Sequence, residues 1–245
     1  MEGDYELVVE AEGYQTHREN LSFSFPDRTK VHLNIYLREA SPRDEEGVSP
    51  QALKWYDQGV KAAAKGKSKK AIQLYRKAVD REPEFLPGLH NLGAEYVKIG
   101  DFRKSVEVLE KAVRLKTSNG GTYHVLGLAY YHLKEWSQAA RDFQIAIEKQ
   151  DAQTSGASHF YLGHALLQLK QPREAAEHLL RSLQIEEKSF SRAHLSLAFI
   201  YLDYSNQPQK ALGHLEAFLK LNPKDERAPR IRQKIEQLKA RSGPR

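Results

Sequence analysis

The first 38 residues alternate apolar and polar side chains, which is the pattern of a β-strand with one buried face. The alternation runs through residues 5–11, 21–25 and 31–37, and Val8 is its one break in the first of these ranges. Three antiparallel strands are therefore predicted. Because a sheet this small has one apolar face, it needs a second layer to cover that face.

From Gln51 onward the apolar residues recur at helical spacing instead of in alternation. Short polar turns such as KGKS and LKQP separate the helical segments. Between the alternating segment and the helical segment, residues 39–50 are polar and contain proline, so this stretch is predicted to be a linker.

The helical part repeats itself. Gly59, Gly93 and Gly127 lie 34 residues apart, Gly163 follows 36 residues later, and Ala198 takes the same place in a fifth unit. In each of the first four units a small residue comes 12 positions after the glycine, and a large apolar residue comes 16 positions after it. Small residues let two helices approach closely, and large residues fill the remaining gap, so each unit is predicted to be a helical hairpin.

This pattern resembles the tetratricopeptide repeat, a helix–turn–helix unit of 34 residues, over residues 51–223. The resemblance implies a mainly all-α fold, a right-handed α-solenoid of five repeats with a small antiparallel β segment before it. Residues 224–245 are predicted to form a capping helix and tail, because Ile231, Ile235 and Leu238 make one apolar stripe.

Residues 1–38 resemble the last part of a carboxypeptidase regulatory-like (transthyretin-like) β-sandwich, through the alternation from Gly3 to Tyr14. Such sandwiches have about seven strands. We therefore expect this segment to be a partial sandwich and Met1 to fall inside a longer gene product.

In proteins that resemble this one, one face of each first helix lines a concave groove that takes peptide ligands. The equivalent positions here lie three residues before each repeat glycine, then one, four and five after it. We call the residues predicted to bind a partner the groove stripe: Tyr56, Val60, His90, Val97, Lys98, His124, Leu128, Tyr131, His132, Phe160, His164, Leu167, Leu195 and Phe199. Exposed aromatic residues on a concave face suit the anchoring of a peptide.

The histidines of the groove stripe suggest a metal site as one hypothesis. However, the sequence contains no HExxH motif and no i, i+4 histidine pair with a carboxylate, so no metal site is predicted. We expect these histidines to be partly solvated, which predicts a partner affinity that changes between pH 5 and pH 7. The two-carboxylate clamp known in this family is not predicted, because Asn91 alone matches it.

Composition narrows the function further. The chain has no cysteine, a net charge of +6 and no recognisable nucleic-acid module. The GKS at residues 66–68 lacks the preceding strand and glycine of a phosphate-binding loop. Since no catalytic signature stands out either, the sequence predicts no enzyme, no cofactor and no nucleic-acid partner.

The predicted function is a non-catalytic scaffold that binds a protein or peptide of unknown identity. The alternative is a ligand-sensing or cell-envelope assembly module that uses the same groove or the β segment. Self-association through the sheet edge stays open. No membrane span and no signal peptide are predicted, so the chain is expected in the cytoplasm as written, or in the periplasm or envelope if Met1 is not the native start.

Overall fold

The computed structural model describes residues 2–9, 17–24, 48–115, 120–149 and 152–241. These residues form two strands and eleven helices. The strands are β1 (Glu2–Val9) and β2 (His17–Ser24), and the helices are α2 (Pro50–Ala64), α3 (Ser68–Arg81), α4 (Leu86–Lys98), α5 (Phe102–Arg114), α6 (Gly120–His132), α7 (Trp136–Glu148), α8 (Ala152–Gln168), α9 (Pro172–Glu186), α10 (Ala193–Asp203), α11 (Pro208–Leu221) and α12 (Ala228–Arg241).

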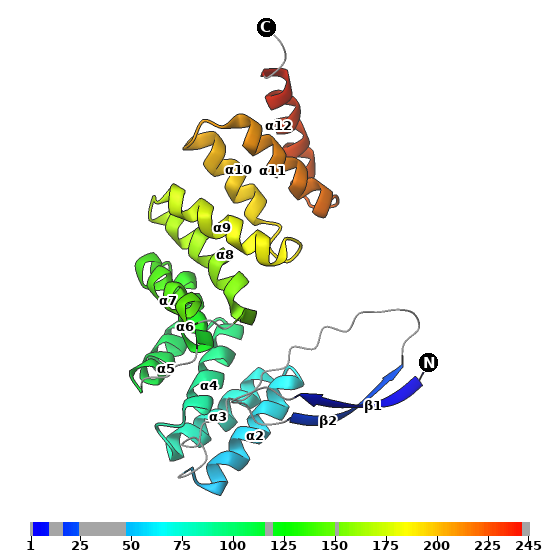
Figure 1. Ribbon diagram of the computed structural model, residues 1–245. Coiled ribbons are helices and arrows are strands. Elements are labelled where there is room, and N and C mark those ends of the chain that lie inside the picture. Colours follow the sequence, from blue (N-terminus) through cyan, green and yellow to red (C-terminus); the bar gives the residue numbers. More distant parts are fainter. Residues whose placement is uncertain (1, 10–16, 25–47, 116–119, 150–151, 242–245) are drawn as a thin grey trace.

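Consecutive helices pair into hairpins that stack one on the next, from α2–α3 to α10–α11 (Figure 1). The first helices of neighbouring hairpins also touch, because α4 contacts α6 and α6 contacts α8. The mainly all-α solenoid predicted from the repeat spacing is confirmed.

Each hairpin turns through one residue with left-handed backbone. Gly66 and Gly100 take this conformation in the first two hairpins, with φ of 68° and 80°. In the next three, Lys134 (φ 63°), Lys170 (φ 60°) and Asn206 (φ 48°) take it instead. Glycine adopts this conformation without steric cost, whereas a lysine side chain meets the neighbouring backbone there.

The repeat positions hold glycine because a large side chain of the second helix packs directly against them and leaves no room for a Cβ atom. A Cβ atom added to Gly127 would come within 2.8 Å of the Phe143 ring, and one added to Gly163 within 2.7 Å of Leu179 Cγ. The small residue of the second helix also contributes, since the buried Ser105 hydroxyl donates to the Gly93 carbonyl at 2.9 Å. The spacing of small and large residues therefore results from the packing of the two helices in each hairpin, as predicted.

The last helix covers the end of the stack. Ile231, Ile235 and Leu238 of α12 are 8%, 5% and 4% exposed, and they share a core cluster with Phe218 of α11. The predicted apolar stripe thus keeps the final hairpin from presenting its core to water.

In the N-terminal segment, β1 pairs antiparallel with β2 in a register that sets Tyr5 opposite Leu21 and Gly3 opposite Phe23. The expected third strand at 31–37 and the linker up to residue 47 lie outside the described residues.

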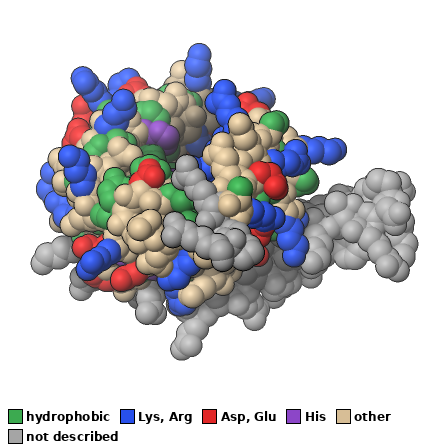
Figure 2. Space-filling view, turned by 90° about the horizontal axis from the view of Figure 1, so that it is seen from above, with side chains coloured by type: hydrophobic (Ala, Val, Ile, Leu, Met, Phe, Trp, Pro, Cys, Tyr) green, Lys and Arg blue, Asp and Glu red, His purple; other side chains and the backbone are tan. Residues whose placement is uncertain are grey.

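The surface of the stack is strongly charged. Viewed from the end where α12 lies, Lys and Arg side chains project around the periphery, with hydrophobic side chains showing between them (Figure 2). On this face, cationic side chains therefore project further than the apolar side chains that lie between them.

Candidate protein-binding groove

The groove stripe lies on the first helices α2, α4, α6, α8 and α10, as the repeat pattern requires. The first helices α4, α6 and α8 contact one another across hairpins, which places this row of helices on the inner side of the stack. The structure divides the stripe by exposure. Val60, Lys98, His132 and Phe199 are exposed, His124 is buried, and the rest are half-buried: Tyr56, His90, Val97, Leu128, Tyr131, Phe160, His164, Leu167 and Leu195.

The prediction that His124 is a solvated groove residue is wrong. Its side chain is 9% exposed and hydrogen-bonds through Nδ1 to the buried Ser158 hydroxyl at 2.8 Å. The Phe143 ring lies beside it, with ring centroids 5.6 Å apart. Burial, with a smaller contribution from the charge of His90, lowers the pKa of His124 to about 4. His124 therefore does not change charge between pH 5 and pH 7 and cannot supply the predicted pH dependence of partner affinity.

Equivalent positions make similar bonds between hairpins. His90 Nδ1 lies 3.0 Å from the Thr122 hydroxyl, which repeats the His124–Ser158 bond one unit earlier. The predicted stripe thus contains a row of bonds that join one first helix to the next. The sequence carries a signal for it, since Thr122 and Ser158 stand 36 residues apart at equivalent places of units three and four.

The first pair of hairpins is joined in the same way. The Asn91 amide donates to the Tyr56 hydroxyl at 3.0 Å, so the side chain that matches the two-carboxylate clamp is occupied within the chain. Tyr56 also packs edge-on against Phe85, with ring centroids 5.0 Å apart. These contacts give Tyr56 a role in joining units.

Two aromatic members of the stripe, Tyr131 of α6 and Phe160 of α8, pack against other rings of the stack. Tyr131 meets Trp136 and Tyr161 edge-on, each with a centroid distance of 5.2 Å, and burial raises its pKa. Phe160 meets Tyr161 at 5.4 Å and His164 at 4.5 Å. Truncating either ring would therefore weaken the stack as well as any groove.

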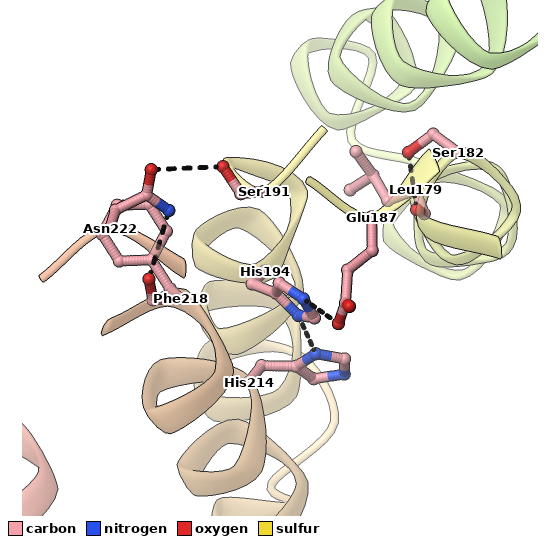
Figure 3. Close-up of polar contacts among 8 residues, drawn as sticks. All are labelled: Leu179, Ser182, Glu187, Ser191, His194, His214, Phe218 and Asn222. Atoms are coloured by element: carbon pink, nitrogen blue, oxygen red, sulfur yellow. Dashed lines mark hydrogen bonds and ion pairs between the residues drawn. The ribbon is translucent and has the colours of Figure 1, made fainter. Parts of the chain in front are cut away.

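Sequence reasoning missed two histidine pairs that lie inside hairpins. His194 of α10 and His214 of α11 approach through their Nδ1 atoms at 2.8 Å, and Glu187 lies 3.2 Å from the other nitrogen of His194 (Figure 3). His159 and His178 repeat this contact at 2.8 Å between α8 and α9. Burial, followed by the partner imidazole, lowers the pKa of His159 and of His214 to about 4.

In each pair one Nδ1 donates its N–H to the Nδ1 of the other ring, so both Nδ1 atoms are hydrogen-bonded within the hairpin. The 36-residue spacing of His178 and His214 was the available signal. Among the described residues, no group of three or more His, Cys, Asp or Glu side chains is arranged to hold a metal ion. None of the described helices is long and apolar enough to cross a membrane.

The open part of the inner face lies between α8 and α10. There, an open hollow of about 560 Å³ is lined by Leu167, Gln168, Lys170, Leu195, Ser196, Phe199 and Tyr204. We call it the α8–α10 hollow. Phe199 and Tyr204 are 47% and 51% exposed and meet edge-on, with ring centroids 5.6 Å apart. The hollow thus brings three groove-stripe residues, Leu167, Leu195 and Phe199, together with residues that the stripe did not include, among them Lys170 and Tyr204.

The polar groups of the hollow are few. Ser196 Oγ lies 3.5 Å from His164 Nε2, which is longer than the 2.6–3.2 Å at which a histidine activates a serine nucleophile. Among the described residues, Lys170 is the one charged side chain in the lining. The hollow therefore offers apolar contact area and one cation.

Comparison with known proteins agrees with this architecture. Models of the tetratricopeptide repeat match residues 86–119 and 124–191. Among curated proteins, anaphase-promoting complex subunit 6 of Arabidopsis thaliana is 28% identical over 143 residues, which is 57% of this chain and 26% of that protein. This chain therefore spans about a quarter of that relative.

Two solved structures are similar along most of the helical stack. MamA is 26% identical with a TM-score of 0.62, over 68% of this chain and 95% of its own. YrrB, described as a tetratricopeptide repeat protein with an unusual peptide-binding site, is 19% identical with a TM-score of 0.65, over 74% of this chain and 92% of its own. The matches and the observed hairpins together support tetratricopeptide repeats in this chain.

Proposed function

We propose that this protein is a non-catalytic interaction scaffold that binds a peptide or protein segment on the inner face of its helical stack. One observation carries the proposal: in the α8–α10 hollow, two large aromatic side chains stand about half exposed beside Leu167 and Leu195. Apolar surface that is concave and exposed is typical of a binding site.

A comparison of Phe199 with the rest of the groove stripe supports the α8–α10 hollow as the binding site. At the position equivalent to Phe199, Leu128 of α6 and His164 of α8 are half-buried. Val60 of α2 is exposed at this position, but it is a smaller, aliphatic side chain. Tyr131 and Phe160 are held by other rings of the stack. Phe199 is thus an aromatic stripe residue whose ring is available for a partner, and clusters of such rings are common binding hot spots.

The fold favours binding over catalysis. The same fold carries a peptide-binding site in YrrB, and solenoids commonly present their concave surfaces to extended partners. The lining of the hollow holds apolar groups, two hydroxyls, an amide and one lysine, and its Ser196 lies 3.5 Å from His164, beyond the 2.6–3.2 Å at which a base activates a nucleophile.

The test is selection of binding peptides from a displayed random library, followed by affinity measurement with two variants. Phe199→Ala removes the exposed ring of the hollow. Ile185→Ala is the matched control, because Ile185 is 41% exposed but belongs to α9, a second helix, and does not line the hollow. The proposal predicts that selected peptides bind Phe199→Ala at least tenfold more weakly, about the loss expected from one aromatic anchor, and bind Ile185→Ala as they bind the wild type. Equal affinity for both variants would contradict it.

We also infer that residues 1–38 form part of a carboxypeptidase regulatory-like β-sandwich. The antiparallel register of β1 and β2 and the alternation at 31–37 support this inference. Amide hydrogen exchange of the whole protein tests it, because a third paired strand protects the amides of residues 31–37. Exchange there at the rate of an unstructured peptide would rule out the third strand.

A further inference from the structure

The α8–α10 hollow has an unbalanced charge. Lys170 is its one charged lining residue, and no carboxylate lines it among the described residues. Within the described part of the chain, Lys170 takes part in no ion pair, although Lys98 and Lys104 each pair with an acidic residue of their own turn. A cation therefore stands beside exposed aromatic rings, and no carboxylate among the described residues is paired with it.

Lys170 also occupies a backbone position that favours glycine. Its φ is 60°, and Gly66 and Gly100 fill the equivalent turns of the first two hairpins with φ of 68° and 80°. A residue with a side chain is less stable in this conformation than glycine. Lys134 and Asn206 take the same left-handed backbone in their turns, so this strain comes with the hairpin turn and does not by itself mark a ligand site. The place of Lys170 in the hollow and its lack of a counter-ion among the described residues carry the inference.

We propose that the hollow binds an acidic peptide segment, with a large apolar side chain seated against Phe199 and Tyr204 and a carboxylate beside the Lys170 ammonium group. This inference rests on the proposed function and specifies the chemistry of its ligand. The rings contribute contact area, and the lysine selects for negative charge in the residues that flank the anchor.

The test uses three short fluorescein-labelled peptides with the same central tryptophan, flanked by glutamates, by glutamines or by lysines. Fluorescence anisotropy measures the affinity of each for the whole protein. We expect the glutamate peptide to bind about fivefold more tightly than the glutamine peptide, as one partly exposed ion pair allows, and the lysine peptide to bind most weakly. Added salt should narrow the difference. If the glutamate peptide binds no more tightly than the lysine peptide, the acidic class is wrong.

A pair of glycine variants separates recognition from folding. Lys170→Gly and Lys134→Gly both relieve left-handed strain, but only Lys170 lines the hollow. Lys170→Gly should therefore lose the fivefold preference for glutamate while its melting temperature rises, and Lys134→Gly should keep the preference. A Lys170→Gly protein that still prefers the glutamate peptide overturns the proposal.

The Phe199→Ala variant distinguishes a failure of the acidic preference from a failure of the proposed peptide binding. It should weaken the glutamate and the glutamine peptides alike, because the aromatic anchor serves both. If Phe199→Ala weakens both peptides and Lys170→Gly changes neither, the groove binds peptides but does not select acidic ones. If Phe199→Ala changes neither, the proposed function fails as well.

Discussion

The buried His124 makes the stability of the stack depend on pH. Its pKa falls to about 4 when the protein folds, because the charged imidazolium would be buried next to Phe143 with only the Ser158 hydroxyl to solvate it. The unfolded chain holds the same histidine at an ordinary pKa of about 6.5. A histidine with a lowered folded pKa stabilises fully above the unfolded pKa, and this stability is lost as the pH falls toward the folded pKa.

The size of the effect follows from the two pKa values. Between pH 7.5 and pH 5, the unfolded state takes up nearly one proton at this site and the folded state takes up almost none. At about 1.4 kcal/mol for each pKa unit, this difference lowers the free energy of unfolding by about 2 kcal/mol at pH 5. Other buried histidines add to the total loss, so only a comparison with a variant isolates His124.

His124→Asn is the informative variant, because an amide does not titrate in this range and can still hydrogen-bond to Ser158. Urea unfolding at pH 7.5 and at pH 5 gives the two free energies for each protein. The variant should lose about 2 kcal/mol less than the wild type over this interval. If wild type and His124→Asn lose the same stability, then His124 is not buried as a neutral group.

Three further predictions concern packing and backbone. Gly127→Ala should lower the free energy of unfolding by about 1–3 kcal/mol, since the new Cβ would meet the Phe143 ring at 2.8 Å, and an unchanged melting temperature would contradict this contact. Lys134→Gly should raise the free energy of unfolding, because glycine relieves about 1 kcal/mol of left-handed strain, and the entropy that glycine adds to the unfolded chain offsets part of this gain. A clear loss of stability in chemical denaturation would show that φ is not left-handed there. Ile235→Ala should cost about 2–5 kcal/mol locally and speed amide exchange in α11, whereas exchange as slow as in the wild type would show that α12 does not cap the stack.

The architecture of the helical part could be predicted because close packing leaves a strict pattern in the sequence. Gly127 and Phe143 must stay 16 residues apart for one helix to approach the other, and the same requirement recurs in the first four hairpins. Helical periodicity likewise placed Ile231 and Leu238 on the buried face of α12.

How deeply each groove-stripe residue is buried could not be predicted in the same way. His124 and Phe199 both fall on the predicted stripe, yet one is 9% and the other 47% exposed. Periodicity gives the direction of a side chain from its own helix, but burial also depends on how closely the next hairpin approaches. Between α6 and α8 the helices touch and cover His124, whereas between α8 and α10 they leave a hollow beside Phe199.

The residues outside the stripe were missed for a related reason. Tyr204 follows the end of α10 and Lys170 lies in a turn, so neither shares the helical period of the first helices. The pairing of His194 with His214 depends on the angle between two helices, which spacing along the chain does not encode.

A methyl NMR titration with a selected peptide tests most directly whether the inner face is the binding surface. Binding in the α8–α10 hollow should shift the methyl signals of Leu167 and Leu195 and leave those of Ile185 on α9 in place. Shifts confined to Ile185 and other methyl groups of the second helices, with Leu167 and Leu195 unchanged at saturation, would show that the partner binds elsewhere.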